Sequence, residues 1–400
     1  MSFDPSQYVY LDWAATAPLC EEAANAMAPF LVPGKGNIAV GGNPNSLHSP
    51  GRAAFSALES ARSRIARALR ARRPDEIVFT SGATEADNAA LVGLAHAQRA
   101  CRHVDSGDIR VVVSSIEHDA VLEPARRLKS EGFDVVFVEP DRQGFILPDV
   151  LRAALGDDGH AAVVSVQAAN SEVGSIQPVA DLARAAHDAG ALFHTDAVQM
   201  LGKHPVDLGA WGVDAASFSA HKVGGPKGVG ALFLKSRTPF SAQLLGGGQE
   251  TGRRSGTQNP CGAAGFAAAC EAAVESLPHQ APRLAALRDE LYARLCSMKG
   301  VRAAVEVSAG SEAFLPNIVN VLVENVESQT MILRLDAMGF GVSGGSACAS
   351  HSLEPSHVLR AIGIDRDAAQ GALRISMGRG TSEEDVHAFL EAMPRCLAWG

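Results

Sequence analysis

Strand-like and helix-like segments alternate between about residue 77 and residue 235, and this alternation limits the possible folds more than any other feature of the chain. Short apolar runs are followed by longer segments that have the period of an amphipathic helix. The strand-like runs are EIVFT, DIRVVVSS, DVVFV, AAVVSV, ALFHTD, DAASFS and GALFLK. Such alternation is typical of a mostly parallel sheet covered by helices. We therefore expect an α/β fold.

The stretch from Ala191 to Gly230 places an acid and an amine after two of these strands. Asp196 closes the run ALFHTD, and Lys222 follows the run DAASFSAH just before two glycines. Open α/β sheets bind ligands at this kind of strand end. A buried acid and an amine at one site suit catalysis with pyridoxal phosphate. The lysine forms a Schiff base with the cofactor, and the acid keeps the ring nitrogen of the cofactor protonated. Taken alone, the stretch fits a strand-end Asp and a surface Lys equally well.

The pattern changes after the glycine-rich run that ends near residue 260. An Ala-rich helical segment follows over 261–298, and then NIVNVLV and ALRISM read as strands between shorter helices. Four hundred residues also suit two domains better than one. We expect a large cofactor-binding domain over residues 1–260 and a smaller α+β domain over 261–400. We also expect the N-terminal segment to pack on the smaller domain.

Composition excludes several classes of protein. Hydrophobic residues make up 46% of the chain and charged residues 20%, and no apolar run reaches the length of a membrane span. The net charge of −9 argues against nucleic acid or a membrane as the main partner. Seven scattered cysteines without a C-x-x-C pair indicate neither a metal site nor disulfides. The start MSFDPSQYVY has no signal-peptide pattern, so we expect a cytoplasmic protein.

The run SGATEA, from Ser81 to Ala86, is a candidate phosphate site. It lies between a predicted strand and a predicted helix, where unbonded backbone N–H groups and the helix dipole attract an anion. Many helices that start in this way have only a capping box. Ser219 and His221, just before Lys222, would face one side if the strand geometry persists, and could donate to the same phosphate.

Three further polar residues follow predicted strands. His118 could stack on a pyridine ring and move protons, although a lone histidine there is more often a cap. Asn170 and Gln199 could bond the phenolic oxygen of the cofactor, and the residues alone do not favour either one.

Cys348 and Arg374 lie in the smaller predicted domain. Cys348 sits among small residues in VSGGSACAS, as a mobile nucleophilic thiol would require, although an inert thiol in a turn has the same surroundings. Arg374, in the strand LRISM, could bind a carboxylate at two points, but most strand arginines lie at the surface.

Twelve motifs from about Leu11 to Thr381, nearly the whole chain, resemble in order those of the cysteine desulfurases. The resemblance is to the branch named for nitrogen fixation and iron–sulfur cluster assembly. The motifs are LDWAAT, GNPNSLHSPG, FTSGATEADN, EHDAV, ANSEVGSIQP, FHTDAVQ, SFSAHKVGGPKGVG, GGGQETGRRSGTQN, LPNIVNV, SGGSACAS, SLEPSHVLRAIG and LRISMGRGT. The resemblance implies the aspartate-aminotransferase fold (fold type I), an obligate homodimer and pyridoxal 5′-phosphate as cofactor.

The resemblance also assigns roles to single residues. Lys222 would be the Schiff-base lysine, Asp196 the partner of the ring nitrogen, and His118 a stacking and proton-transfer residue. Cys348 would be the thiolate that takes the substrate sulfur as a persulfide, and Arg374 would bind the substrate carboxylate. Asn170 and Gln199 would bond the O3′ of the cofactor. The phosphate would be held by Ala83, Thr84, Ser219, His221 and, from the neighbouring subunit, Thr257.

The chain departs from the family pattern beside these residues. Trp13 replaces the usual Asn or Tyr, Ser171 replaces an Asn, and Gly344 replaces a Ser. These departures bear on rate and partner choice more than on reaction type.

The sequence therefore predicts conversion of L-cysteine to L-alanine, with the sulfur passed to an acceptor or iron–sulfur scaffold protein. Rival functions on the same fold are an aminotransferase, a selenocysteine lyase or a kynureninase-like lyase, and these reactions need no sulfur carrier such as Cys348. A non-catalytic sulfur carrier would need neither Lys222 nor Asp196. The sequence names neither the acceptor nor the pathway.

Overall fold

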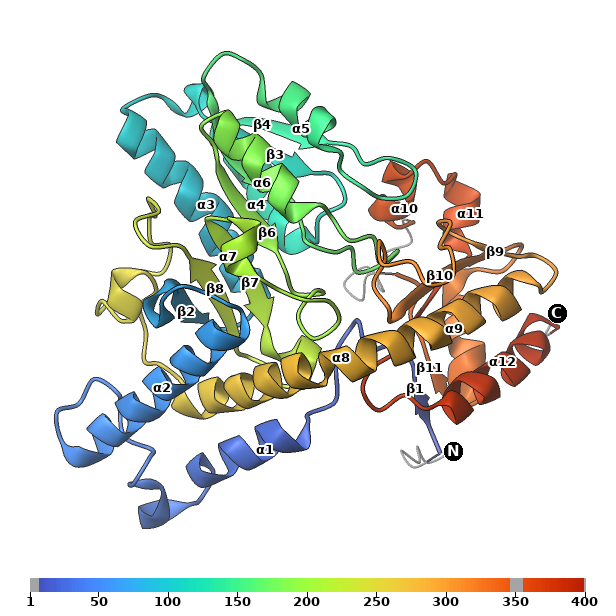
Figure 1. Cartoon of the computed structure of the whole chain (residues 1–400), viewed down its shortest axis with the longest axis horizontal. Helices are drawn as coiled ribbons and strands as arrows, with labels where there is room; N and C mark the ends of the chain where they lie inside the picture. Colours follow the sequence, from blue (N-terminus) through green and yellow to red (C-terminus); the bar gives the residue numbers. More distant parts are fainter. Residues whose placement is uncertain (1–6, 346–354, 399–400) are drawn as a thin grey trace.

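The computed structural model describes residues 7–345 and 355–398, and they form two packed parts joined by one long helix (Figure 1). The larger part is built on a seven-stranded sheet with the order β2-β8-β7-β6-β5-β3-β4. Only β8 runs antiparallel to its neighbours, so the mostly parallel sheet predicted from the alternation is confirmed. The strands are β2 (Ile77–Thr80), β3 (Arg110–Ser114), β4 (Asp134–Val138), β5 (Ala161–Ser165), β6 (Leu192–Asp196), β7 (Ala215–Ser219) and β8 (Gly230–Leu234).

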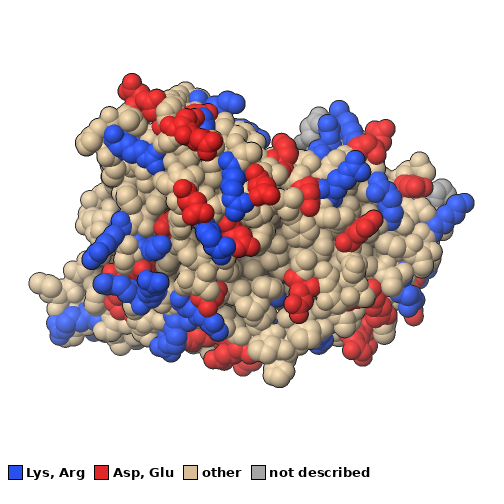
Figure 2. Space-filling view, turned by 45° about the horizontal axis from the view of Figure 1, so that its top comes forward, with Lys and Arg blue, Asp and Glu red and all other residues tan. Residues whose placement is uncertain are grey.

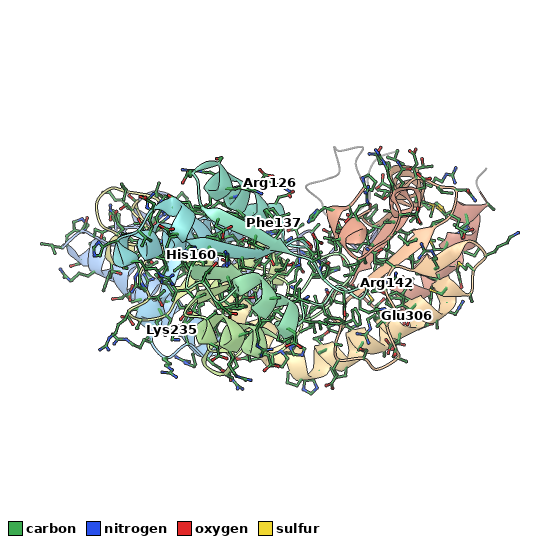
Figure 3. The ribbon with its side chains drawn as sticks, turned by 90° about the horizontal axis from the view of Figure 1, so that it is seen from above. Arg126, Phe137, Arg142, His160, Lys235 and Glu306 are labelled. Carbon is green, nitrogen blue, oxygen red and sulfur yellow. The ribbon has the colours of Figure 1, made fainter. Side chains whose placement is uncertain are left out.

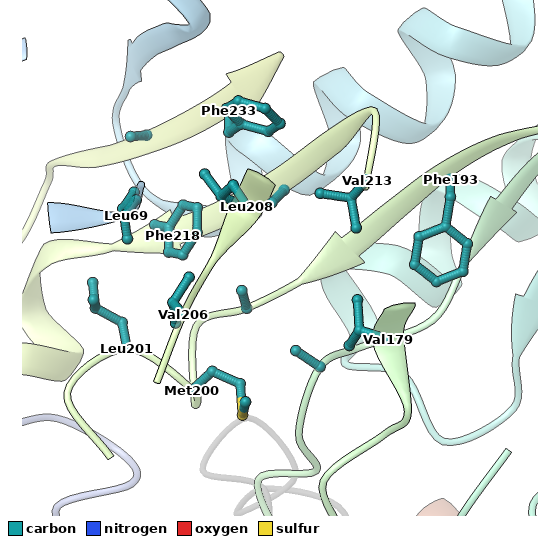
Figure 4. Close-up of a cluster of buried hydrophobic side chains, with 14 of the residues drawn as sticks. Leu69, Val179, Phe193, Met200, Leu201, Val206, Leu208, Val213, Phe218 and Phe233 are labelled. Carbon is teal, nitrogen blue, oxygen red and sulfur yellow. The ribbon is translucent and has the colours of Figure 1, made fainter. Parts of the chain in front are cut away.

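Both faces of this sheet are covered by helices. Successive residues of a strand point to opposite faces, so on β8 Phe233 packs in one apolar cluster while Leu232 packs in the other. Figure 4 shows the first cluster, in which Phe218 and Phe233 lie near Leu69 at the end of α2. The helices of this part are α1 (Glu21–Met27), α2 (Ser49–Ala68), α3 (Ala83–Arg102), α4 (Asp119–Ser130), α5 (Pro148–Leu155), α6 (Val179–Asp188) and α7 (Leu208–Trp211).

The glycine-rich loop between α1 and α2 contains a 3-10 turn, Gly34–Asn37. The following helix begins at Ser49, because Nδ1 of His48 accepts a hydrogen bond from the N–H of Gly51 at 3.2 Å and caps the helix there.

The long helix α8 (Pro260–Cys296) extends over 37 residues and belongs to both parts. Its first half packs with the large sheet through Phe266 and Cys270. Its second half packs in a separate core through Leu287 and Leu291. The change from one core to the other therefore falls inside α8. The division of the chain at residue 260 stays a prediction.

The smaller part is an antiparallel three-stranded sheet with β10 between β12 and β9. A two-stranded parallel sheet pairs β1 with β11, and Leu11, just after β1, is buried in the core of the smaller part. The N-terminal segment thus lies against the C-terminal part. The elements are β1 (Val9–Tyr10), β9 (Val301–Ala303), β10 (Ile318–Val323), β11 (Phe340–Gly341), β12 (Ala372–Ser376), α9 (Ser328–Ala337), α10 (His357–Ala361), α11 (Arg366–Gln370) and α12 (Glu383–Leu397).

The loop after β4 also joins the two parts. The rings of Phe145 and Phe314 meet edge-on at 5.4 Å, and Oε1 of Gln143 accepts a hydrogen bond from the N–H of Glu306 at 2.9 Å. In Figure 3, Arg142 and Glu306 lie close together beside this junction. Polar and aromatic contacts therefore fix the smaller part against the sheet.

The surface carries charges of both signs. Figure 2 shows Lys and Arg interspersed with Asp and Glu over the face that it presents. No helix within the described residues is long and apolar enough to cross a membrane.

Candidate active site

A cavity of about 490 Å³ opens where the parallel strands of the large sheet end. Strand-end loops form most of its wall, in agreement with the rule that α/β sheets bind ligands at this edge. The smaller part contributes Arg374. The predicted site residues that line the cavity are Ala83, Thr84, His118, Asp196, Gln199, Ser219, His221, Lys222 and Arg374.

Lys222 lies in a 3-10 turn, Ala220–Val223, directly after β7. Gly224 ends the turn with a positive φ of 85° and lies close to the Cys20 side chain and the Pro18 carbonyl, so a side chain there would be strained and crowded. The Lys222 Nζ donates to the backbone oxygens of Ala14 and Ala15 at 2.7 and 2.8 Å. The N-terminal segment therefore holds the amine in the cavity wall.

Asp196 is the last residue of β6, as the sequence predicted. Its Oδ1 accepts a hydrogen bond from the N–H of Val198 at 2.9 Å. Burial raises the pKa of Asp196, while this hydrogen bond and the nearby His118 and Lys222 act in the opposite direction. A cation bound beside Asp196 would further offset the energetic cost of burying its negative charge.

Two further buried acids near Asp196 were missed by the sequence analysis. Asp87 lines the cavity, and Glu117 precedes His118. Burial raises the pKa of Asp87 and of Glu117 well above the usual range, and the charge on Asp196 raises both further. Burial therefore favours the neutral form of both acids, while Asp196 has His118 and Lys222 nearby to favour its charged form. The Asp in TEADN and the Glu in IEHD, next to site motifs, were the only signals in the sequence.

His118 caps helix α4. Its Nδ1 accepts a hydrogen bond from the N–H of Ala120 at 3.1 Å, which fixes the ring at the cavity wall. His118 is therefore a helix cap that also lines the cavity. Its part in the chemistry stays a prediction.

One end of the cavity is suited to an anion. Helix α3 starts at Ala83, and its N-cap is Gly82, which has no side chain to bond the first N–H groups. Glu85 in the first turn does not line the cavity, and its carboxylate pairs with Arg254 at 2.7 Å and accepts a hydrogen bond from the N–H of Ser81 at 2.7 Å. Thr84 lines the cavity beside these N–H groups.

Ser219 and His221 also line this end, but for a different reason from the one expected. Strand geometry stops at Ser219, and His221 belongs to the 3-10 turn, so strand alternation does not align them. The His221 Nδ1 lies 3.1 Å from the Thr16 Oγ1. Burial first, and then Lys222, Lys227 and Lys203, lower the pKa of His221 to about 4. His221 is therefore a neutral hydrogen-bonding group at this positive end.

The structure separates the two amides that the sequence treated alike. Gln199 lines the cavity and donates from Nε2 to the Ala14 carbonyl at 3.1 Å. Asn170 is buried but does not line the cavity, because its Oδ1 accepts from the N–H groups of Glu172 and Val173 at 2.8 and 2.9 Å. Asn170 shapes the loop after β5. Its contact with a ligand stays a prediction.

Arg374 is almost fully buried on β12 and points into the cavity from the smaller part. It donates to the carbonyl of Ser171 at 3.0 Å and to Oδ1 of Asp12 at 2.8 Å. Asp12 is a partner that the sequence analysis did not identify. Its position in the LDWAAT motif was the only signal. The Asp12 carboxylate and the Ser171 carbonyl hold the guanidinium in place.

Two further predicted site residues are not among the described residues that line the cavity. Thr257 is exposed and is not part of the cavity wall formed by its own chain. Cys348 falls in 346–354, outside the described residues. The roles of both stay predictions.

The three departures from the family pattern have identifiable neighbours. Trp13 donates from Nε1 to the Tyr10 carbonyl at 3.0 Å, and a Cβ on Gly378 would lie 2.0 Å from its ring. Ser171 lines the cavity. At Gly344 a Cβ would lie 1.9 Å from the Ser328 Oγ, so a serine there would require a shift of Ser328.

Comparison with known proteins agrees with this geometry. The family model described as Aminotransferase class-V matches residues 9–389. This chain belongs to the class V aminotransferase family. A cysteine desulfurase IscS of Dictyoglomus turgidum is 40% identical over 393 residues, which cover 97% of this chain and 94% of the relative. The family resemblance predicted from the motifs is confirmed.

Solved structures agree on the fold. A NifS-like protein has a TM-score of 0.87 and 37% identity, with coverage of 98% of this chain and 100% of that one. The protein SspA, solved in complex with cysteine, has a TM-score of 0.76 and 32% identity, with coverage of 92% of this chain and 98% of that one. The fold-type-I prediction is confirmed.

Pyridoxal 5′-phosphate is the cofactor of this family and of this chain. The cavity fits it at both ends, with the first turn of α3 for the phosphate and Asp196 for the ring nitrogen. The Oε1 of Gln199 and the Nε of Arg374 are buried and have no hydrogen-bond partner within the described part of the chain. A buried polar atom without a partner is costly. These two atoms therefore suit a polar ligand in the cavity.

Proposed function

We propose that this protein is a cysteine desulfurase that converts L-cysteine to L-alanine and carries the sulfur as a persulfide on Cys348. The observation that carries the proposal is that Lys222, Asp196 and Arg374 line one cavity, so an amine, an acid and a carboxylate clamp face the same space. The names of the relatives, cysteine desulfurase IscS among them, support this choice among the reactions of the fold.

Bound pyridoxal phosphate supplies an electron sink for the substrate carbon atoms. Lys222 attaches the cofactor, and Asp196 stabilises the positive charge on its ring. Arg374 binds the substrate carboxylate and thereby orients the substrate sulfur. The Lys222 amine and His118, which both line the cavity, move protons to and from the substrate.

The sulfur transfer assigned to Cys348 balances without an added oxidant. A bond forms between the thiolate sulfur of Cys348 and the substrate sulfur, while the substrate C–S bond breaks. The electron pair of that bond stays with the carbon skeleton, which takes up a proton and leaves as alanine. The persulfide then passes to an acceptor protein, such as an iron–sulfur scaffold.

Replacing Cys348 by serine separates this function from its rivals. The Cys348→Ser protein should still change its absorbance when L-cysteine is added, because Lys222, Asp196 and Arg374 are intact. It should produce no alanine and no sulfide, since a hydroxyl is a far weaker nucleophile than a thiolate. Cys101→Ser, at an exposed thiol, is the matched control.

Alanine production at the parent rate in Cys348→Ser would contradict the persulfide route and favour a lyase. Assays with L-selenocysteine and with an amino-group acceptor, run beside L-cysteine, would detect a selenocysteine lyase or an aminotransferase. A parent protein that binds no cofactor would be a non-catalytic carrier.

We also propose that the protein is a homodimer in which Thr257 of each chain reaches the phosphate in the cavity of the other. Five large apolar side chains are exposed between residues 31 and 55: Leu31, Val32, Ile38, Leu47 and Phe55. Asn45 in this segment donates to Oε1 of Gln258 at 3.0 Å, so Thr257 lies beside the same face. An exposed apolar patch of this kind is typical of an interface.

Light scattering of Leu47→Asp tests the dimer. Leu47 is 91% exposed, so an aspartate there should not disturb folding, but it should lower the measured mass toward that of a single chain. Leu147→Asp, at another exposed leucine, should leave the mass unchanged. A single-chain mass for the parent protein would contradict the dimer.

A cytoplasmic location is part of the proposal. The cysteines at 20, 101, 261, 270, 296 and 396 are all unpaired, which is usual in a reducing compartment. Fractionation of the native cells would test it.

A further inference from the structure

Lys203 is a buried lysine that lies on the far side of Lys222 from the main cavity. It lies in the turn after β6, where Gly202 adopts a positive φ of 72°. Only 9% of Lys203 is exposed. Its Nζ donates a hydrogen bond to the backbone oxygen of Lys222 at 2.8 Å.

Lys203 lines a second cavity, of about 250 Å³. Lys222 lines both cavities, so its main chain forms part of the partition between them. The charged and titratable groups around Lys203 come from three other segments: Cys20, the adjacent His221 and Lys222, and Arg379, which pairs with Glu22 at 2.9 Å. No Asp or Glu is among the described residues that line this cavity.

The surroundings of Lys203 are therefore apolar and positive. Burial first, and then the charge of Lys222, lower the pKa of Lys203 to about 7. The interaction is mutual, because two like charges destabilise each other equally. A positive charge on Lys203 therefore also acts on the Lys222 amine.

We propose that Lys203 is a positioning residue that holds the Lys222 main chain by its hydrogen bond and whose positive charge favours the neutral, nucleophilic form of the Lys222 amine. A neutral donor could make the same hydrogen bond, and burying a lysine costs solvation energy. The positive charge is therefore the property that distinguishes a lysine from a neutral donor at this position. The inference rests on the proposed role of Lys222 as the cofactor-attaching residue.

The test is covalent capture of pyridoxal phosphate by the full-length, cofactor-depleted protein. The neutral amine adds to the cofactor aldehyde and one water leaves, with no oxidation or reduction, and only the unprotonated amine reacts. The capture rate, followed by absorbance from pH 6 to pH 9, thus reports the neutral fraction of Lys222. Borohydride reduction and peptide mapping then identify the labelled lysine.

Lys203→Met removes the charge and the hydrogen bond, and Lys203→Gln keeps a donor without charge. Both variants should capture the cofactor about tenfold more slowly than the parent at pH 6, because the repulsion between the two amines is lost. The difference should vanish above about pH 8, where Lys203 of the parent is itself neutral. Lys203→Arg, which stays charged, should capture faster than either neutral variant up to pH 9.

If Lys203 only held the Lys222 main chain in position, its replacement would slow capture equally at every pH. That result would overturn the inference. So would equal rates at pH 6 for the parent and Lys203→Gln, which is the deciding variant if Lys203→Met does not fold. A label found on another lysine in the parent protein would instead remove the proposed role of Lys222, and the inference with it.

Discussion

The seven-stranded sheet and the three-stranded sheet contribute to the same cavity in different ways. Parallel strands end at one edge, so the large sheet gathers Asp196, Lys222 and His118 from three different strand ends. The antiparallel sheet has no such common edge, and it contributes one residue, Arg374 in the middle of β12. In the proposed function, the large sheet would therefore provide the cofactor chemistry, and the small one would provide the clamp for the substrate carboxylate.

This difference also separates binding of the cofactor from binding of the substrate. Changes at the large sheet should affect the cofactor and the chemical step. Changes at β12 should affect the concentration of substrate that is needed. Variants of three residues test this division.

The largest effect is expected from Lys222→Ala. Without the amine no covalent bond to the cofactor can form, so the absorbance band of the attached cofactor and the desulfurase activity should both be lost. Lys227→Ala, at a second lysine of the cavity wall, is the matched control and should keep the band. A borohydride-stable pyridoxyl label on Lys227 in the Lys222→Ala protein would contradict the assignment.

Asp196→Asn should keep the cofactor and lose about 100-fold or more in kcat, because a neutral amide does not stabilise a ring cation. The control is Asp87→Asn. Burial raises the pKa of Asp87 and so favours its neutral form, and the amide should therefore change kcat much less than Asp196→Asn does. Equal losses in the two variants would mean that the charge is shared and not confined to Asp196.

Arg374→Lys should raise KM for L-cysteine by about tenfold or more, because lysine cannot make the two-point contact with a carboxylate. Cofactor absorbance should be unchanged, since β12 belongs to the other sheet. Asp12→Asn should raise KM less, because it loosens the guanidinium without removing it. A loss of bound cofactor in Arg374→Lys would break the division between the two sheets.

The smallest effect is a pH dependence of stability at His194. This buried residue of β6 lies between the hydroxyls of Ser165 and Ser217, and burial lowers the pKa of its imidazole to about 3. The unfolded chain binds a proton at this residue below about pH 6.5 and the folded chain does not, so stability is lost as the pH falls from 6.5 toward 3. The Tm of the parent should drop more between pH 7.5 and pH 5 than that of His194→Asn. Equal drops would contradict this account.

Single residues show how far sequence reasoning reached. Asp196 at the end of a strand and Arg374 within one were predicted correctly, because apolar runs mark the strands and the position of a polar residue in a run is local information. The positions of Asp87, Glu117 and Asp12 in or beside the site were not predictable from pattern alone. Each lies beside a motif residue, but only the packing of α3 and of the N-terminal segment brings Asp87 and Asp12 to the site and leaves Glu117 buried next to it.

The sequence by itself determined the mostly parallel sheet, the strand-end positions of the acid and the amine, and the family, since these depend on hydrophobic periodicity and on the order of motifs along the chain. Tertiary structure alone decided that Asn170 faces its own loop while Gln199 faces the cavity, that α8 runs through both cores, and that Lys203 lies behind Lys222. The reason is physical. Burial and long-range hydrogen bonds arise between segments that are far apart in the chain, and periodicity within one segment carries no record of which other segment will cover it.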